Sequence, residues 1–245
     1  MRIDIYYTPL LVDEKALRDK TVVAIDVLRA STSITTALSN GAREVIPVVT
    51  VEAAVKLAAN LAADIVLLAG ERNAKMIDGF QLGNSPLEYV PDVVKGKTIV
   101  FSSTNGAQAL AKGRLARELA VCSFVNMSEV TGFLSLPPRD FTIICAGTNG
   151  EFSLEDATCA GMLIDGVRRR HGADVEFSDG ALAAMTLYRS LGKDLPAMFR
   201  LGQHGRLLEG LGFVEDVRFC GRVDAVPVLP VLDGNVLRLK RETEK

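Results

Sequence analysis

Four apolar runs in this chain each lead directly into a cluster of polar residues. The runs are residues 21–25, 65–69, 99–101 and 141–145. The polar groups that follow them, in the same order, are Asp26 with Arg29, Glu71 with Arg72, Ser103-Thr-Asn-Gly106, and Gly147-Thr-Asn-Gly150 with Ser153, Glu155 and Asp156. Short, wholly apolar runs are typical of strands buried on both faces of a parallel sheet. Because open α/β sheets build their sites at the carboxyl ends of such strands, we expect these polar groups to meet at one edge of one sheet.

Helical segments alternate with the expected strands along the chain. Strands are expected at residues 2–7, 22–26, 44–49, 64–69, 98–102, 120–123, 141–145 and 214–219, and helices at 31–40, 52–63, 106–112, about 128–134, 154–170, 178–192 and 203–212. Residues 71–86 show no clean period and are expected to form a loop, and the polar tail 234–245 is expected to be frayed. The alternation predicts a layered α/β/α fold around a mostly parallel or mixed sheet. We expect one domain, residues 1–245, or the same domain with a C-terminal subdomain from about residue 172.

The bulk composition excludes several classes of partner. The net charge is −2, so no basic footprint for nucleic acid is present. No uncharged apolar run approaches the roughly 20 residues that span a bilayer, and the charged first 20 residues contain no signal-peptide core. Cys122, Cys145, Cys159 and Cys220 are widely spaced, which is typical of reduced thiols. We therefore expect a cytoplasmic protein with neither a nucleic-acid nor a membrane partner.

Two acid–arginine pairs stand at predicted strand ends. An uncompensated carboxylate at the end of a buried strand is costly, so Asp26 is expected to bind a cation, to accept backbone N–H groups or to do chemistry. Arg29 and Arg72 can each grip phosphate, sulfonate or carboxylate through two hydrogen bonds. Two such pairs therefore indicate a small polyanionic ligand. The alternatives are an internal Asp26–Arg29 ion pair and, for Glu71 with Arg72, ordinary surface charge near a helix end.

Three further segments offer groups that bind anions. Ser103, Thr104, Asn105 and Gly106 combine hydroxyls, an amide and free N–H groups at a predicted helix N-terminus, which suits phosphate. Asn84 and Ser85 lie in the long loop, which can cover a site beside Glu71. His204 is the histidine with the more informative setting. The alternatives are a simple turn for the first two segments and a surface position for His204.

Carboxylates gather around the helix start at Ser153, the predicted N-cap residue. Glu151, Glu155 and Asp156 lie within this segment. Glu155 and Asp156 diverge by about 100° on a helix, so only one of them can point into a site. Hard oxygen ligands of this kind suit Mg²⁺. The alternative is that these acids only complement the helix dipole.

An ordered set of motifs is similar to one known family. The motifs are Ile25-Asp-Val-Leu-Arg-Ala-Ser-Thr32, Leu68-Ala-Gly-Glu-Arg72, Gly79-Phe-Gln-Leu-Gly-Asn-Ser-Pro-Leu-Glu88, Ser103-Thr-Asn-Gly106, Cys122-Ser-Phe-Val-Asn126, Ile144-Cys-Ala-Gly147, Phe152-Ser-Leu-Glu-Asp156, His204-Gly-Arg-Leu-Leu208, Gly212-Phe-Val-Glu-Asp216, Val223-Asp224 and Val226-Pro227. Together they resemble the 2-phosphosulfolactate phosphatase family over nearly the whole chain. Ser31 and Ser103 stand where the family pattern leads us to expect Thr, and both keep the hydroxyl.

The resemblance implies a Mg²⁺-dependent phosphatase with an α/β fold of its own. The reaction it implies converts (2R)-2-phospho-3-sulfolactate to 3-sulfolactate and phosphate, on the route to coenzyme M. The alternatives are a phosphatase for another 2-phospho-hydroxy acid, such as phospholactate, and a non-catalytic anion-binding protein on the same fold. A homodimer is left open.

Taken together with the resemblance, the candidate residues suggest a division of roles. Asp26, with Glu71 or Asp156, is expected to hold Mg²⁺ against the phosphate. Arg29 and Arg72 would neutralise the anionic groups of the substrate. The residues expected to contact the substrate are Asn84, Ser85, Ser103, Thr104, Asn105, Gly106, Ser153 and His204. Whether Asp26 instead attacks the phosphate as a nucleophile is left open.

Overall fold

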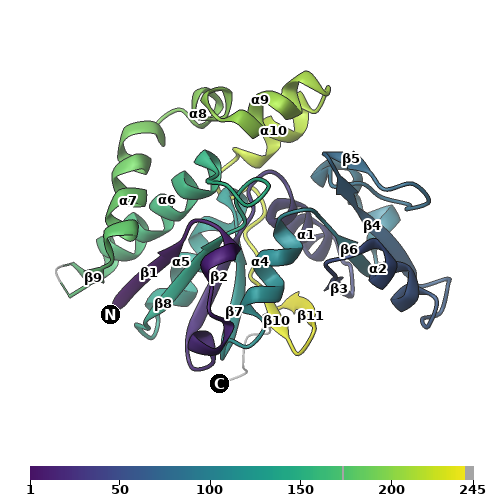
Figure 1. Cartoon of the computed structure of the whole chain (residues 1–245), viewed down its shortest axis with the longest axis horizontal. Helices are drawn as coiled ribbons and strands as arrows, with labels where there is room; N and C mark the ends of the chain where they lie inside the picture. The colour runs from purple at the N-terminus through teal and green to yellow at the C-terminus, as the bar shows by residue number, and fades with distance from the viewer. Residues whose placement is uncertain (173, 241–245) are drawn as a thin grey trace.

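The computed structural model describes residues 1–172 and 174–240. Within them, eleven strands form one mixed sheet with helices packed on both faces (Figure 1). In spatial order the strands are β5 (Lys75–Met76), β4 (Val66–Arg72), β6 (Thr98–Ser102), β3 (Glu44–Pro47), β11 (Val236–Leu239), β10 (Pro230–Asp233), β7 (Glu118–Cys122), β2 (Thr21–Ile25), β8 (Phe141–Cys145), β1 (Arg2–Tyr6) and β9 (Glu176–Phe177). The pairings that involve β5, β10 or β11 are antiparallel and the others are parallel. The predicted α/β fold with a mixed sheet is confirmed.

Each central strand is buried on both faces, which is why it reads as a continuous apolar run. On β2, Val22 and Ala24 pack in the core beneath α1 (Ala30–Ser39) and α4 (Gly106–Gly113), whereas Val23 and Ile25 face the opposite core. That second core lies beneath α5 (Met127–Ser135), α6 (Leu154–His171) and α7 (Asp179–Leu191). The short helix α3 spans Pro91–Val94, and α2 (Val51–Ala58) covers β4 and β6. The result is three layers with the sheet in the middle.

Three short helices form an arc at the top of Figure 1. They are α8 (Leu195–Leu201), α9 (Gln203–Gly210) and α10 (Val214–Cys220). Short 3-10 helices also occur at Pro9–Leu11, Glu14–Leu17, Pro86–Glu88 and Phe124–Asn126. The strand expected at 214–219 is wrong, because this segment is α10. Its buried residues Asp216, Val217 and Cys220 are spaced one, then three apart, which puts them on one face of a helix. The helix α8 was not predicted.

The tail from residue 234 is ordered as far as Lys240, contrary to the expectation that it is frayed. Strands β10 and β11 form a hairpin in the middle of the sheet, between β3 and β7. Leu237 is fully buried there, and Arg238 contacts Glu44 at 2.6 Å. The dipeptide Asp233-Gly234 between apolar residues is a hairpin signal that the polar composition of the tail obscured. Residues 241–245 lie outside the described part of the chain.

The segment 71–86 begins as a strand rather than a loop. β4 continues through Glu71 and Arg72, and β5 pairs back onto these two residues. The other predicted elements are present, with ends that differ by a few residues. No helix in residues 1–172 or 174–240 has both the length and the apolar character needed to cross a membrane. The expectation of one domain, or of a subdomain from about residue 172, stays a prediction.

Candidate functional site

A small cavity opens where the carboxyl ends of β2, β4, β6 and β8 meet the helical arc. Its volume is about 220 Å³. The residues that line it are Asp26, Leu28, Arg29, Glu71, Asn73, Ala74, Asn84, Thr104, Asn105, Thr148, Asn149, His204, Leu207 and Leu211. Seven of these were candidate site residues from the sequence: Asp26, Arg29, Glu71, Asn84, Thr104, Asn105 and His204. The structure therefore brings together groups that lie up to 178 residues apart along the chain (26 to 204).

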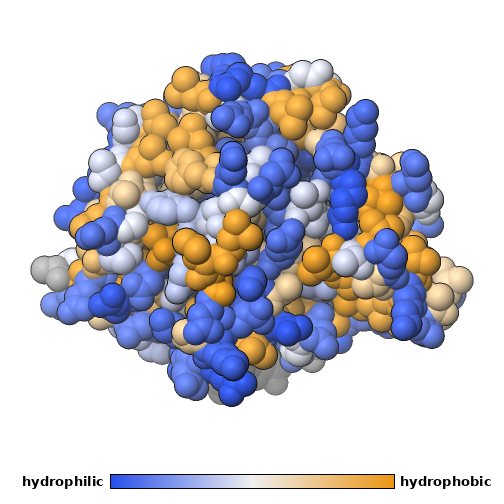
Figure 2. Space-filling model, in the orientation of Figure 1, coloured by the Kyte–Doolittle hydropathy of each residue, from blue (hydrophilic) through white to orange (hydrophobic). Residues whose placement is uncertain are grey.

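The rim of this cavity on the side of the arc is apolar. Leu207 and Leu211 line the cavity and are also 50% and 40% exposed. Leu201 and Val214 are exposed nearby on the same arc. Figure 2 shows apolar side chains at the top of the molecule, where Figure 1 places α8 to α10. The cavity thus has a polar floor at the sheet edge and an apolar rim.

Asp26 lies on the floor of the cavity, immediately after β2. Its side chain is almost fully buried, and its Oδ1 accepts a long hydrogen bond of 3.4 Å from the N–H of Ala30. Burial raises the pKa of Asp26 to about 7, and the negative charges of Glu71 and Glu155 add to this rise, while the N–H of Ala30 and the charge of Arg29 oppose it. The carboxyl group is therefore under-compensated within the protein and would be stabilised by a cation.

Gly106 lets the first turn of α4 approach Asp26 closely. A Cβ atom built at Gly106 would lie 2.6 Å from Asp26 Oδ2 and 2.6 Å from the Cβ of Ala30. Both distances are well below van der Waals contact, so any side chain here would displace the carboxylate. Gly106 is thus part of the site because it has no side chain.

Glu71 joins two strand ends through its carboxylate. Oε1 accepts a hydrogen bond of 2.8 Å from the N–H of Thr104, and Oε2 accepts one of 2.8 Å from the N–H of Ala74. The first bond ties the end of β4 to the loop after β6, and the second fixes the turn between β4 and β5. Glu71 therefore shapes the cavity wall as well as adding charge to it.

Three buried polar atoms on this cavity have no hydrogen-bond partner among the described residues. They are Asn84 Oδ1, Thr104 Oγ1 and His204 Nδ1. Buried polar atoms in folded proteins are nearly always hydrogen-bonded, and so three unpartnered atoms around one cavity indicate a polar ligand. Burial lowers the pKa of His204, although the Leu28 backbone and the charge of Glu71 oppose this. The imidazole is therefore neutral at neutral pH.

Arg29 is the buried cation of the cavity. Its Nη1 donates to Asp216 Oδ2 at 2.5 Å and its Nη2 donates to the carbonyl of Ala74 at 2.9 Å. The guanidinium also lies 4.1 Å from the centre of the Phe213 ring. Asp216 and Phe213 had no predicted role, because they lie more than 180 residues from Arg29, within and just before a segment expected to be a strand. The one signal for them was their place in the motif Gly212-Phe-Val-Glu-Asp216.

Arg72, Ser85 and Ser103 do not line the cavity in the structure. Arg72 donates to the carbonyls of Glu71 and Val49 and to Ser102 Oγ, at 2.7, 2.9 and 2.9 Å. Since β4 continues through residues 71 and 72, adjacent side chains point to opposite faces of the strand, and Arg72 turns away from Glu71. Ser85 Oγ donates to Asp216 Oδ1 at 2.7 Å, and Ser103 Oγ accepts from the N–H of Ala107 at 3.0 Å.

The helix start at residue 153 separates the two adjacent acids. Ser153 is the N-cap of α6, as predicted, and accepts a hydrogen bond of 3.2 Å from the N–H of Asp156. Asp156 accepts from the N–H groups of Val27 and Gly147, at 2.9 and 3.1 Å. Burial and the neighbouring Asp26 raise the pKa of Asp156, and these two N–H groups oppose the rise. Its carboxylate thus braces the loops after β2 and β8.

Glu155 points into an adjoining cavity of about 560 Å³, which shares Thr148, Asn149 and His204 with the first. Burial raises the pKa of Glu155 as well. The prediction that only one of the two adjacent acids faces a ligand is consistent with this arrangement, in which Glu155 lines a cavity and Asp156 does not.

The predicted metal ligands Asp26, Glu71 and Asp156 do not form a three-carboxylate centre. In residues 1–172 and 174–240, no group of three or more His, Cys, Asp or Glu side chains is arranged to hold a metal ion. Glu71 and Asp156 each accept backbone N–H hydrogen bonds on both carboxylate oxygens. Asp26 and the unpartnered amide oxygen of Asn84 are still hard oxygen donors on the cavity. That set fits Mg²⁺, which is commonly held by one or two carboxylates together with waters and substrate phosphate.

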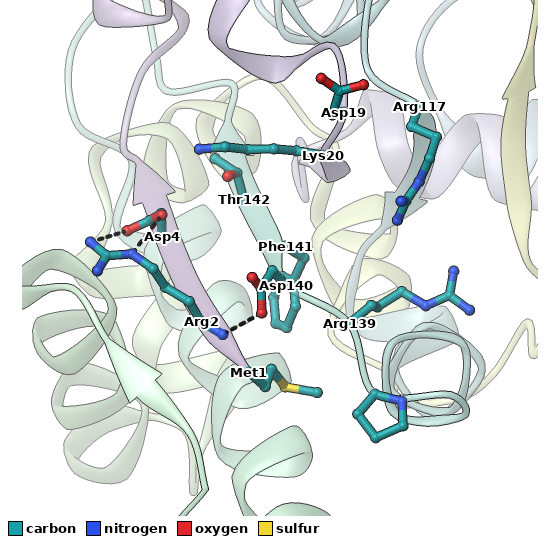
Figure 3. A pocket seen from close by; sticks show the side chains of 11 residues that line it. Met1, Arg2, Asp4, Asp19, Lys20, Arg117, Arg139, Asp140, Phe141 and Thr142 are labelled. Atoms are coloured by element: carbon teal, nitrogen blue, oxygen red, sulfur yellow. Dashed lines mark hydrogen bonds and ion pairs between the residues drawn. The ribbon is translucent and has the colours of Figure 1, made fainter.

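A larger hollow of about 540 Å³ lies at the opposite end of β1, β2 and β8 (Figure 3). Several of its charges are paired within the protein, for example Arg2 with Asp4 at 3.3 Å and Arg139 with Glu118 at 2.6 Å. Thr142 Oγ1 is its one lining atom among the unpartnered buried polar atoms of the described residues. The smaller cavity, with three such atoms and a buried arginine, is the better candidate site.

Comparison with known proteins agrees with the family suggested by the motifs. A family model described as 2-phosphosulpholactate phosphatase matches residues 6–235. A protein of Caldanaerobacter subterraneus subsp. tengcongensis is 43% identical over 242 residues, which cover 99% of this chain and 100% of that protein. Relatives in Clostridium novyi and Thermotoga maritima are 39% and 42% identical, over 94% and 90% of this chain and 96% and 92% of their own lengths. Each of the three is named "Probable 2-phosphosulfolactate phosphatase".

Proposed function

The chain belongs to the 2-phosphosulpholactate phosphatase family, and we propose that it hydrolyses the phosphate ester of (2R)-2-phospho-3-sulfolactate to give 3-sulfolactate and phosphate. The observation that carries this proposal is the cavity in which Arg29 and three unpartnered polar atoms converge at the strand ends. Arg29 and the hydroxyl of Thr104 can donate to the oxygens of a polyanion, whereas the amide oxygen of Asn84 is an acceptor and suits a cation.

The groups on the cavity suit the parts of this substrate. Phosphosulfolactate carries a phosphate, a sulfonate and a carboxylate on a short carbon chain. Arg29 can neutralise one of these groups, and the unpartnered hydroxyl of Thr104 can donate a hydrogen bond to another. The adjoining cavity, which shares Thr148, Asn149 and His204 with the first, gives room for the end of the substrate that does not react.

Acidic residues on the cavity support a cation as a second component of the site. The charges of Glu71 and Glu155 already help to raise the pKa of Asp26 to about 7. A bound phosphate would add more negative charge to the same space. We therefore propose Mg²⁺ as the cofactor, held by Asp26 and by the amide oxygen of Asn84. When bound, it would neutralise charge on the phosphate oxygens.

The chain's own residues would act mainly by positioning and by charge stabilisation. Hydrolysis of phosphate monoesters is among the slowest uncatalysed reactions, and enzymes accelerate it by up to about 10²¹-fold. Fixed charges and donors that match the transferring group supply most of such an effect. Arg29 would hold one anionic group, Thr104 would orient another, and neutral His204 would hydrogen-bond to water or substrate through Nδ1. The apolar rim formed by Leu207 and Leu211 would limit the access of bulk water.

A substrate panel tests this function. Purified protein is assayed with phosphosulfolactate, phospholactate, phosphoglycolate and p-nitrophenyl phosphate, each with Mg²⁺ and with EDTA. We expect the highest kcat/KM for phosphosulfolactate, loss of activity in EDTA and its recovery when Mg²⁺ is added back. A preference for phospholactate would mean that phospholactate, and not phosphosulfolactate, is the substrate. Phosphate release no faster than background on all four compounds would contradict the proposed function itself.

A further inference from the structure

Asp216 contacts the cavity arginine from outside the cavity. It lies on α10, is 3% exposed and does not line the cavity. Its Oδ2 accepts from Arg29 Nη1 at 2.5 Å, and its Oδ1 accepts from Ser85 Oγ at 2.7 Å. Both carboxylate oxygens are therefore used, one on the arginine and one on a serine of the loop that follows β5.

The guanidinium of Arg29 is also held on its other sides. Nη2 donates to the carbonyl of Ala74 at 2.9 Å, and the ring of Phe213 lies 4.1 Å from the guanidinium carbon. An arginine side chain loses much rotamer entropy when it is fixed in one conformation. Because these contacts fix Arg29 before a ligand arrives, the ligand does not have to supply that ordering.

A stabilising role alone does not account for the pair. In the described residues, Arg29–Asp216 is the ion pair in which both side chains are buried, at 2% and 5% exposure. A buried pair often contributes no more to stability than apolar residues of similar volume would. This ion pair lies directly behind the cavity, where a fixed guanidinium group can bind an anionic group of a ligand.

We propose that Asp216 is a positioning residue, which holds the guanidinium of Arg29 in place to receive an anionic group of the ligand, with Ser85 holding Asp216 in turn. This inference rests on the proposed function, because it gives Arg29 its anionic ligand. It assigns a role in the site to the segment 213–216, which reaches the cavity from a part of the chain far from Arg29.

The test is Asp216→Asn, which keeps the shape of the side chain and removes its charge. The amide oxygen can still accept from Arg29, and the Ser85 hydroxyl can accept from the amide N–H. We expect kcat/KM to fall roughly 10- to 100-fold, as is typical when a supporting residue is altered. We expect inorganic phosphate to bind more weakly by a similar factor. The Nε–H signal of Arg29 in a ¹H–¹⁵N spectrum, assigned with Arg29→Lys, should move or broaden.

Asp165→Asn is the matched control. Asp165 is a buried carboxylate paired with Arg189 at 2.6 Å, and it does not line the cavity. This variant should leave phosphate affinity and kinetics unchanged. If Asp216→Asn does not fold, Ser85→Ala keeps the ion pair and should weaken phosphate binding by a few-fold in the same direction.

Phosphate affinity and the Arg29 signal are measured without turnover, which separates this proposal from the proposed function. If no substrate is hydrolysed but Asp216→Asn weakens phosphate binding, the function fails and the role of Asp216 stands. A folded Asp216→Asn protein with wild-type phosphate affinity and an unchanged Arg29 signal would overturn the role of Asp216. So would a wild-type protein that binds no phosphate.

Discussion

Replacing Asp26 by Asn should make the protein more stable and less active at the same time. The carboxyl group is almost fully buried, close to other acids, and receives one long hydrogen bond. Its ionised form is therefore costly in the folded state without a cation. Asn has nearly the same shape and no charge. We expect turnover to fall by about 10²-fold or more, as when a fixed electrostatic group is lost, while the free energy of unfolding rises.

The expected gain follows from the pKa of Asp26. A rise from 3.8 to about 7 corresponds to roughly 4 kcal/mol at about 1.36 kcal/mol per pKa unit. The new amide N–H group would be buried near Gly106 with no acceptor, which costs about 1–3 kcal/mol. The net gain is about 2 kcal/mol, or a rise in Tm of about 4–8 °C for a chain of this length.

The gain should depend on pH with a definite sign. The folded pKa of Asp26 lies above its unfolded value of 3.8. The contribution of the wild-type Asp26 side chain to stability is therefore fully present below about pH 3.8, where it is neutral in both states. That contribution is lost as the pH rises through about 7 and the buried carboxyl group ionises. The Asn variant has no such loss. The stability difference between variant and wild type should therefore grow as the pH is raised from about 4 to 8.

The assay is urea unfolding across that pH range, with EDTA present. Glu44→Gln is the control with the opposite sign. Burial alone would raise the pKa of Glu44, but hydrogen bonds from Arg238, Thr98 and Arg43 lower it below its usual value. Its contribution is present above the unfolded pKa of 4.5 and is lost as pH falls through the lower folded value. Glu44→Gln should therefore destabilise the protein at neutral pH, and less so in acid.

Magnesium gives a further check on the same reasoning. A cation bound at Asp26 would compensate its charge, so adding Mg²⁺ should stabilise the wild type and narrow the gap to Asp26→Asn. If Asp26→Asn is less stable than wild type at pH 8 in EDTA, the carboxylate is not under-compensated and the reasoning is refuted.

Four further variants test the assignments around the cavity. Arg72→Lys should cost about 1 kcal/mol of stability through its lost hydrogen bonds and leave the ratio of kcat/KM values for phosphosulfolactate and p-nitrophenyl phosphate unchanged; a changed ratio would return Arg72 to the site. Gly106→Ala should lower kcat/KM by about 10²-fold, because its Cβ would displace the Asp26 carboxylate, as a small misplacement at a site can cost that much; wild-type kinetics would contradict the close contact. Asp156→Asn should change turnover little, because the Asp156 carboxylate binds backbone N–H groups and lines neither cavity, whereas Glu155→Gln should reduce turnover; the reverse pattern would show that Asp156, and not Glu155, faces the ligand.

The part of the site that sequence could predict is the part that lies at strand ends. Asp26, Glu71 and Thr104 each follow an apolar run, and parallel strands bring such positions to one edge of a sheet. The same rule misplaced Arg72, because β4 runs beyond the end of its apolar residues. Three more residues, Gly70, Glu71 and Arg72, belong to this strand, and Arg72 points to the face opposite Glu71.

The contacts of Arg29 were beyond this kind of reasoning. Its ion pair with Asp216 joins segments 187 residues apart, and no local periodicity reports such a contact. The segment 214–219 shows a weak alternation of apolar and polar residues, which led to the prediction of a strand. In the structure it is a helix, because Val217 and Cys220 pack together into the core. The metal prediction paired Asp26 with Glu71 or Asp156, and the sequence could not show that both of these acids accept backbone N–H hydrogen bonds.

The hairpin of β10 and β11 sets a point in the synthesis of the chain at which the site can first exist. These strands join the half-sheet β5-β4-β6-β3 to the half-sheet β7-β2-β8-β1-β9. Glu71 and Thr104 belong to the first half, and Asp26 to the second. Residues 230–239 leave the ribosome after every residue that lines the cavity. A nascent chain that stops before them therefore holds both groups of site residues without the strands that fix the two halves in register, and ligand binding should appear only once this hairpin has folded into place.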